Sequence, residues 1–253
     1  MELLALLLII GLVAGAMNAA AGGGSFITFP ALVYAGVPPI AANASSTVAL
    51  FPASLASAWE FRGYIRPFPK VTMWTMIILT LLGGGTGALL LLYTPAGDFK
   101  KIVPWLLLTG SLAFAFGKSG GVFLRSKFRI GKMVVLSGQF LLGIYGGYFD
   151  CAVDIMMMAV WSLFGLSDIK VINANKTLFV GIANTVAVIF FITAGKVAWN
   201  ETCVMLVATV CGGYFGTKYT KRIDTHFSRC LLNIGEVYNL FLYHQSIRGI
   251  CIA

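Results

Sequence analysis

Residues 146–160 read GGYFDCAVDIMMMAV, and they place two aspartates, Asp150 and Asp154, in a stretch that is otherwise apolar. On a helix, residues that are four apart lie on one face, so the two carboxylates would project together. A carboxylate inside a membrane span is costly and is by default a candidate for function. What these two carboxylates do depends on whether hydrocarbon, protein or water surrounds them.

The composition is that of an integral membrane protein. Of the 253 residues, 58% are hydrophobic and only 11% are charged, whereas a soluble domain carries about 25% charged residues. The 18 basic residues outnumber the 9 acidic ones and lie mostly in short connections between apolar runs. Basic connections of this kind contact lipid headgroups and set membrane topology. We therefore expect the lipid bilayer as a partner and no nucleic acid.

No motif for a metal, a cofactor or a catalytic centre is present. The two histidines lie near the C-terminus, and neither an HExxH pattern nor a Ser–Lys pair occurs in a central span. The GGGS of Gly22–Ser25 lacks the GK[ST] ending of a nucleotide-binding loop. The five cysteines form no CxxC pair, and we interpret them as small apolar residues. The sequence predicts no enzyme, no cofactor and no metal site.

Charges and turn residues divide the chain into hydrophobic blocks, and a spanning helix needs about 20 apolar residues. The eight blocks are 3–37, 40–61, 71–93, 102–117, 133–166, 171–194, 201–217 and 230–247. The first and the fifth are far longer than one helix requires, and glycine or small polar residues interrupt each near its middle. Interrupted backbone inside a membrane must be satisfied by protein or by a water-filled cavity. Two such segments at matching places are typical of a transporter built from repeats, with its site at the breaks.

An internal repeat relates the two long blocks. A shift of 132 residues pairs eight identical residues between 11–63 and 143–195, among them Asn43 with Asn175. We therefore predict an all-α membrane protein of about eight segments in two repeated halves, with a broken or re-entrant helix as the first segment of each half. The predicted division is a first half at 1–117, a basic connecting loop at 118–132 and a second half at 133–253.

Two stretches resemble a known family. Residues 18–56 read NAAAGGGSFITFPALVYAGVPPIAANASSTVALFPASLA, and the second half contains GIYGGYF and ANKTLFVGIANTVAVIFFITAGKVAW. These motifs resemble the TauE/SafE family of membrane transporters, often called sulfite exporters. The resemblance implies roughly eight membrane segments in two related halves, and export or uptake of sulfite, sulfoacetate or other small organosulfonates. The chain departs from the family after GGYF, where the family is usually glycine-rich and this chain has Asp150, Ala152 and Asp154.

Asparagines open the helices that we expect after the two interrupted segments. Asn43 and Asn175 are good N-cap residues, and a helix start presents N–H donors to an anion. Two such starts, related by the repeat, could hold a small oxyanion together, with Lys176 as the adjacent cation. Capping alone, and snorkelling of the lysine to the interface, are the alternatives. The predicted substrate-binding residues are Asn18, Gly22, Gly23, Gly24, Ser25, Asn43, Asn175 and Lys176.

Asp150 and Asp154 are predicted to form a proton or coupling site. Like charges about one helical turn apart do not ionise readily together, so one is expected to keep a proton near neutral pH. Under the repeat, Asp150 lies opposite Asn18 and Asp154 lies opposite Gly22. The alternatives are that the acids cap a broken helix or that the segment ends near the interface.

These features predict a secondary transporter in the membrane, with the bacterial cytoplasmic membrane as its location. Its expected cargo is a small sulfur-containing anion, sulfite or an organosulfonate, moved with a proton or another ion. The alternative is a cation- or proton-coupled carrier of another small metabolite, in which Asp150 and Asp154 bind the cation. No ATP-binding motif is present, so primary active transport would need a separate subunit. Both a monomer and a homodimer stay open.

Overall fold

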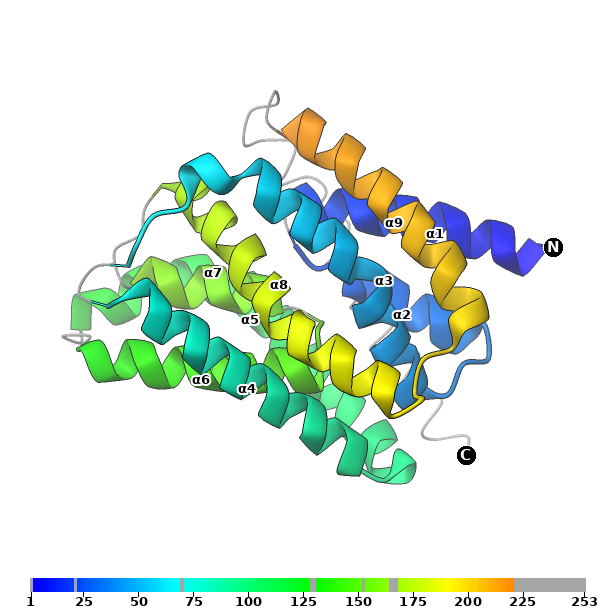
Figure 1. The fold of residues 1–253 in the computed structure, drawn as a ribbon. Coiled ribbons are helices and arrows are strands. Elements are labelled where there is room, and N and C mark those ends of the chain that lie inside the picture. The colour runs from blue at the N-terminus through cyan, green and yellow to red at the C-terminus, as the bar shows by residue number, and fades with distance from the viewer. Residues whose placement is uncertain are drawn as a thin grey trace.

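The computed structural model describes residues 2–20, 22–68, 71–127, 131–151, 153–163 and 168–220, and over these residues the chain is helical (Figure 1). The whole of the eighth predicted block, 230–247, lies outside the described residues, and so do both histidines. The elements are α1 (Glu2–Ala20), α2 (Ser25–Tyr34), α3 (Pro39–Glu60), the 3-10 helix η1 (Arg62–Tyr64), α4 (Met73–Tyr93), α5 (Ala96–Lys127), α6 (Lys132–Tyr148), α7 (Val153–Leu163), α8 (Ile169–Thr193) and α9 (Trp199–Thr220).

Both long hydrophobic blocks are broken, as predicted. The first divides into α1 and the 10-residue α2, and the fifth divides into α6 and the 11-residue α7. Gly22 and Gly23 have φ of 84° and 82°, in the left-handed region that glycine enters without steric cost. The N–H of Gly22 donates to the carbonyl groups of Met17 and Asn18 and so ends α1.

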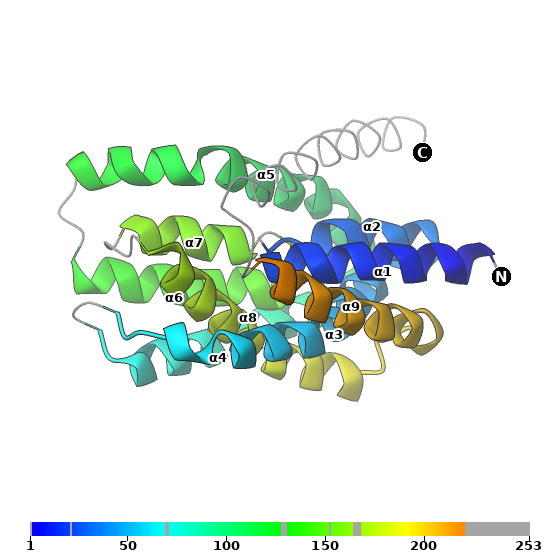
Figure 2. The ribbon, with the colours of Figure 1, turned by 90° about the horizontal axis from the view of Figure 1, so that it is seen from above.

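The short helix of each block folds back along the long one. A Cβ on Gly24 would lie 2.6 Å from the carbonyl oxygen of Ala14, so α2 packs directly on α1 (Figure 2). In the second block, Gly146 lies against Val153 and Gly138 lies against Val160. This register places α6 and α7 antiparallel. Each break is therefore the tip of a helical hairpin.

Glycines allow the remaining helices to approach closely. α1 packs along α9, α4 packs along α6, and the antiparallel α3 and α8 lie side by side in the centre (Figure 1). A Cβ on Gly15 would overlap the backbone of Thr209 in α9, and one on Gly147 would overlap the carbonyl group of Gly84 in α4. Small residues of this kind bring helix backbones together in membrane proteins.

One predicted boundary is wrong. The sequence predicts a connecting loop at 118–132, but α5 continues to Lys127 and α6 begins at Lys132. Lysine and arginine favour helix almost as well as leucine does, so the basic residues that mark a membrane boundary do not end the helix. The connection is confined to the residues between these two helices.

Three helices of the described part are long and apolar enough to cross a membrane. They cover Glu2–Ala19, Met73–Tyr93 and Lys170–Thr193. This agrees with the predicted membrane class, whereas the number of eight segments remains a prediction.

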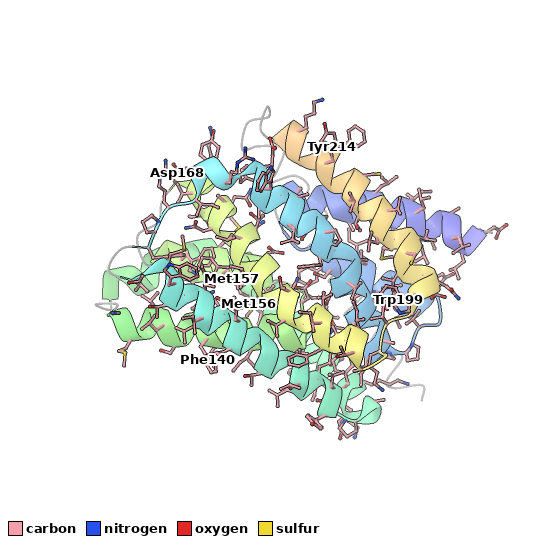
Figure 3. The ribbon with its side chains drawn as sticks, in the orientation of Figure 1. Phe140, Met156, Met157, Asp168, Trp199 and Tyr214 are labelled. Atoms are coloured by element: carbon pink, nitrogen blue, oxygen red, sulfur yellow. The ribbon has the colours of Figure 1, made fainter. Side chains whose placement is uncertain are left out.

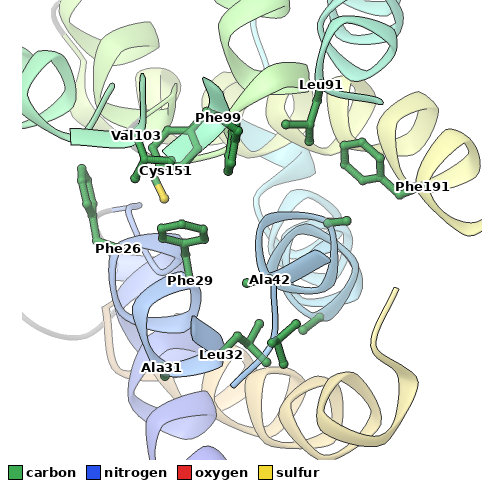
Figure 4. Packing of buried hydrophobic residues seen from close by; sticks show 14 of the residues in the cluster. Phe26, Phe29, Ala31, Leu32, Ala42, Leu91, Phe99, Val103, Cys151 and Phe191 are labelled. Carbon is green, nitrogen blue, oxygen red and sulfur yellow. The ribbon is translucent and has the colours of Figure 1, made fainter. Parts of the chain in front are cut away.

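The apolar core surrounds the tips of the two hairpins. Phe29 of α2 packs edge-on against Phe149 at the second break, with ring centroids 5.4 Å apart. Figure 4 shows this cluster, in which Cys151 lies beside Phe99 and Val103 of α5. Cys151 is fully buried there, in agreement with its interpretation as a small apolar residue. The cluster holds the two breaks in contact.

Candidate functional site

The two breaks meet face to face and bring together residues that are about 130 positions apart. The hydroxyl of Ser25 donates to the carbonyl oxygen of Asp150 at 3.2 Å and to its Oδ2 at 3.4 Å. The N–H of Gly23 donates to Oδ2 of Asp154 at 3.4 Å. A Cβ on Gly22 would overlap the side chain of Asp154. Glycine at this position therefore serves both the backbone conformation and the close approach of the acid.

Asp150 is held by neutral donors. Besides Ser25, the amide of Asn184 in α8 donates to its Oδ1 at 3.0 Å. The corresponding residue of the first half, Asn18, donates to the hydroxyl of Ser54 in α3 at 3.1 Å. Each of these two residues thus ties its break to the long helix of its own half. Asn184 and Ser54 are not among the residues predicted from the sequence, although a polar residue in an apolar helix is the signal that marks them.

Asp154 faces Lys176 of α8. Their closest atoms, Oδ1 and Nζ, are 3.8 Å apart. The side chain of Lys176 is 0% exposed and that of Asp154 is 6% exposed. A fully buried Lys176 side chain does not snorkel, so this alternative is wrong, whereas the depth of the acids in the membrane stays a prediction. Asp154 accepts from the N–H of Gly23, which precedes the N-cap residue Gly24, so the acid binds backbone beside the start of α2 and not the first-turn N–H groups that a cap binds.

One face of α8 carries unpaired polar atoms. Within the described part of the chain, three buried side-chain atoms have no hydrogen-bond partner: Oδ1 of Asn173, Nζ of Lys176 and Oδ1 of Asn184. All three lie on α8, and the side chains of Lys176 and Asn184 contact the acids of the second break. A buried polar group without a partner costs free energy, and in a native protein it calls for an explanation such as a bound ligand.

Asn43 and Asn175 are not N-caps. Pro38 precedes α3, and Asp168 precedes α8 and accepts from the N–H of Lys170 at 2.9 Å (Figure 3). Two prolines therefore begin α3 and an aspartate caps α8, and the two asparagines lie farther inside these helices.

The asparagines instead bind distant backbone. Asn43 donates to the carbonyl oxygen of Tyr148 at 3.0 Å. Asn175 donates to the carbonyl oxygen of Arg66 at 2.9 Å, and its Oδ1 accepts from the N–H of Arg66 at 3.3 Å. Both side chains are buried. They hold chain segments that flank the site, and the structure does not bring them to the acids.

Asn175→Ala is expected to lower the free energy of unfolding by about 1–3 kcal/mol, because it leaves two backbone groups of Arg66 without their partner. Asn43→Ala is expected to have a smaller effect, since it frees only one carbonyl group. Thermal unfolding of the purified variants measures both, with the exposed Asn200 replaced by alanine as the control. Equal stability of Asn175→Ala and the control would contradict a structural role.

Gly24 is the remaining residue of the predicted substrate site. Gly24 packs against Ala14 and Asn18 of α1, so its role is close helix contact. The described residues contain no group of three or more His, Cys, Asp or Glu side chains that could hold a metal ion.

Comparisons with known proteins show which family the chain belongs to. The chain is 30% identical over 219 residues to a probable membrane transporter protein of Haemophilus influenzae, covering 86% of this chain and 85% of that protein. It is 29% identical over 218 residues to the probable membrane transporter protein YfcA of Escherichia coli K12, covering 85% of this chain and 80% of YfcA. No solved structure matches it significantly. The model of the sulfite exporter TauE/SafE family matches residues 7–235. With two broken helical hairpins meeting at a buried charged site and a match over most of its length, this chain belongs to the TauE/SafE family of membrane transporters.

Proposed function

We propose that the protein is a secondary transporter of a small sulfur-containing anion, sulfite or an organosulfonate, across the bacterial cytoplasmic membrane, coupled to a proton or another ion. The observation that carries this proposal is the buried ammonium group of Lys176. It lies beside the two breaks, and within the described part of the chain it has no hydrogen-bond partner. A desolvated ammonium with unused donors is a binding group for the oxygen atoms of a small oxyanion.

The surroundings of Lys176 support an anion site that is assembled at the breaks. The breaks bring the backbone N–H of Gly23 and the hydroxyl of Ser25 to the same place. Backbone groups at a broken helix bind substrates in transporters because they are free of intrahelical partners. The amide of Asn184 adds a neutral polar group on the same helix as Lys176.

An inverted pair of repeats, which transport by alternating access uses, is supported by matching contacts. α1 packs on α9 as α6 packs on α4, and α3 packs on α9 as α8 packs on α4. The N–H of Arg66 donates to Asn175 in α8, and the N–H of Ala198 donates to Ser45 in α3. Residues 66 and 198 are 132 positions apart, which is the shift of the predicted repeat.

A second candidate function is a cation-coupled carrier of another small metabolite. The observation in its favour is the pair of buried acids together with the unpaired Oδ1 of Asn184, since oxygen atoms are the ligands that hard cations prefer. The first proposal requires an anion to bind at the site, and the second requires a cation to bind there.

Thermal unfolding in detergent with sulfite, sulfate, sulfoacetate, taurine and sodium chloride separates the two. We expect sulfite or an organosulfonate to raise the unfolding temperature at a concentration at which sodium has no effect, because a ligand that binds only the folded state stabilises it. Potassium chloride at matched ionic strength is the control. A shift with sodium alone would support the cation carrier and reject the anion transporter.

A further inference from the structure

We infer that Asp154 and the transported anion compete for Lys176, so that one proton enters the site with each monovalent anion. This inference rests on the proposed function, and it assigns the coupling ion and its stoichiometry at the same site.

The contact between Asp154 and Lys176 is loose. Nζ and Oδ1 are 3.8 Å apart, whereas a charge-assisted hydrogen bond brings such atoms to about 2.7–2.9 Å. The second oxygen of Asp154 accepts from Gly23 at 3.4 Å, which is also long. The carboxylate therefore compensates the charge of Lys176 without using its donors, and an anion that used them would bind more strongly.

The exchange balances in charge and in protons. In the closed state the Asp154 carboxylate faces the Lys176 ammonium. Uptake of a proton converts the carboxylate to a neutral carboxylic acid, and the ammonium then faces the oxygen atoms of the anion. No covalent bond other than the new O–H forms, and Asp154, Lys176 and the bound anion together carry no net charge, as the ion pair does before binding. An uncompensated charge in this interior would be strongly unfavourable, so proton and anion must enter together.

The neighbours of Asp154 assign the exchange to it and not to Asp150. Among the described residues that pack around α7, the charged group contributed by α8 is Lys176, and the α6–α7 connection contributes Asp150 and Cys151. Tyr145 of α6 packs against the core cluster that contains Cys151, and its hydroxyl donates to the carbonyl oxygen of Leu106. The α1–α2 break contributes only the N–H of Gly23 and the hydroxyl of Ser25.

The other described charges on α5 lie at its exposed start. They are Asp98, Lys100 and Lys101. Asp150 is held by neutral donors from Asn184 and Ser25, whereas Asp154 alone of the two acids contacts the cation. Protonation of Asp154 therefore removes the countercharge that contacts Lys176, whereas the contacts of Asp150 are with neutral donors.

The proton exchange at Asp154 sets the direction in which pH changes the affinity for the anion. Anion binding requires protonated Asp154, so affinity rises as the pH falls. Where the pair is intact, uptake of one proton per anion makes Kd fall about tenfold for each unit of decreasing pH. Because the pair is fully enclosed, the exchange takes place in states in which the hairpins have opened the site to one side of the membrane.

Proton uptake on binding tests the exchange directly. Isothermal calorimetry of the detergent-solubilised protein with methanesulfonate, which stays monovalent, is run in buffers of different ionisation enthalpy. We expect the parent to take up close to one proton per bound anion. Asp154→Asn is expected to bind without proton uptake and with a pH-independent Kd. Asp150→Asn should keep the proton uptake, and Asp98→Asn, in an exposed ion pair, is the matched control.

Flux in liposomes gives a second readout. Uptake of methanesulfonate by the parent should follow an imposed pH gradient and ignore a potassium diffusion potential. Asp154→Asn should still exchange anion for anion but lose gradient-driven accumulation.

The outcomes separate the two proposals. Binding by the parent without proton uptake overturns the exchange and leaves anion transport standing, and this measurement needs no variant. An Asp154→Asn variant with the pH dependence of the parent also overturns it. A parent that binds no methanesulfonate overturns the exchange as stated, while the thermal shift with sulfite decides separately whether the proposed function survives.

Discussion

Lys176→Gln is expected to weaken binding of the sulfur-containing anion by roughly a hundredfold to a thousandfold, which corresponds to about 3–4 kcal/mol. Glutamine is close to lysine in length but has no charge, so it cannot compensate an anion in a desolvated site. Titration of the purified protein with sulfite and methanesulfonate measures the loss. Because salt barely screens a fully buried charge, the loss should be similar at low and at high ionic strength.

Lys170→Gln is the matched control for this experiment. Lys170 lies on the same helix but is exposed, and its Nζ lies 5.7 Å from the centre of the Tyr64 ring. Its replacement should change affinity little, and any change should vanish at high salt. Unchanged affinity of Lys176→Gln at both salt concentrations would remove Lys176 from the anion site.

Stability distinguishes loss of binding from loss of folding. Removing one member of a buried ion pair leaves the other charge uncompensated and costs about 3–5 kcal/mol, whereas removing both is often close to neutral. Lys176→Gln alone should therefore unfold at a clearly lower temperature. The double variant Asp154→Asn, Lys176→Gln should recover most of that stability and still fail to bind the anion. Recovery of binding by the double variant would show that Lys176 acts only as the partner of Asp154.

Gly147→Ala is expected to lower the free energy of unfolding by about 3 kcal/mol or more, at the upper end of the effects of overpacking. The added Cβ would overlap the carbonyl group of Gly84 in α4. Gly84 is itself pressed against α8, where its own Cβ would lie 2.8 Å from the carbonyl oxygen of Ala183. Since backbone surrounds the position on that side, no side chain can move away, and α4 and α6 must separate.

Gly138→Ala, on the same helix, is the control. Its Cβ would lie 3.6 Å from Cγ1 of Val160, an ordinary van der Waals contact. Alanine favours helix over glycine by about 0.5–1 kcal/mol, so this variant should be as stable as the parent or slightly more stable. Unfolding in mixed micelles compares the two. Equal stabilities of Gly147→Ala and Gly138→Ala would mean that α4 and α6 do not pack as described.

The positions of the glycines show which features of the fold a short stretch of sequence can predict. Glycine-rich interruptions in blocks of excess length predicted both helix breaks, and the structure confirms them at Gly22 and at Phe149. The start of α3 was predicted less well, because an asparagine was preferred over the prolines at 38 and 39 that begin the helix. The end of α5 was placed too early because basic residues mark a membrane boundary and do not terminate a helix.

The sequence predicted several residues of the candidate site but not the contacts between them. The two acids and Lys176 stood out because ionisable groups are expensive in apolar segments. The partner of Asp150, Asn184, was not predicted, since a single polar residue in an apolar helix does not show which distant residue it contacts. Asn43 and Asn175 have the residue type of a cap, yet their partners are Tyr148 and Arg66, far away in the chain.

The sequence by itself determined the membrane class, the family and the places where the two hairpins turn. All of these depend on composition, on backbone freedom at glycine and on motifs, which are properties of short stretches. Only the tertiary structure decided that Asp154 faces Lys176 while Asp150 faces Asn184 and Ser25. Electrostatic and hydrogen-bond energies depend on distances of a few ångströms, and those distances arise only when α8 and the two hairpins pack together.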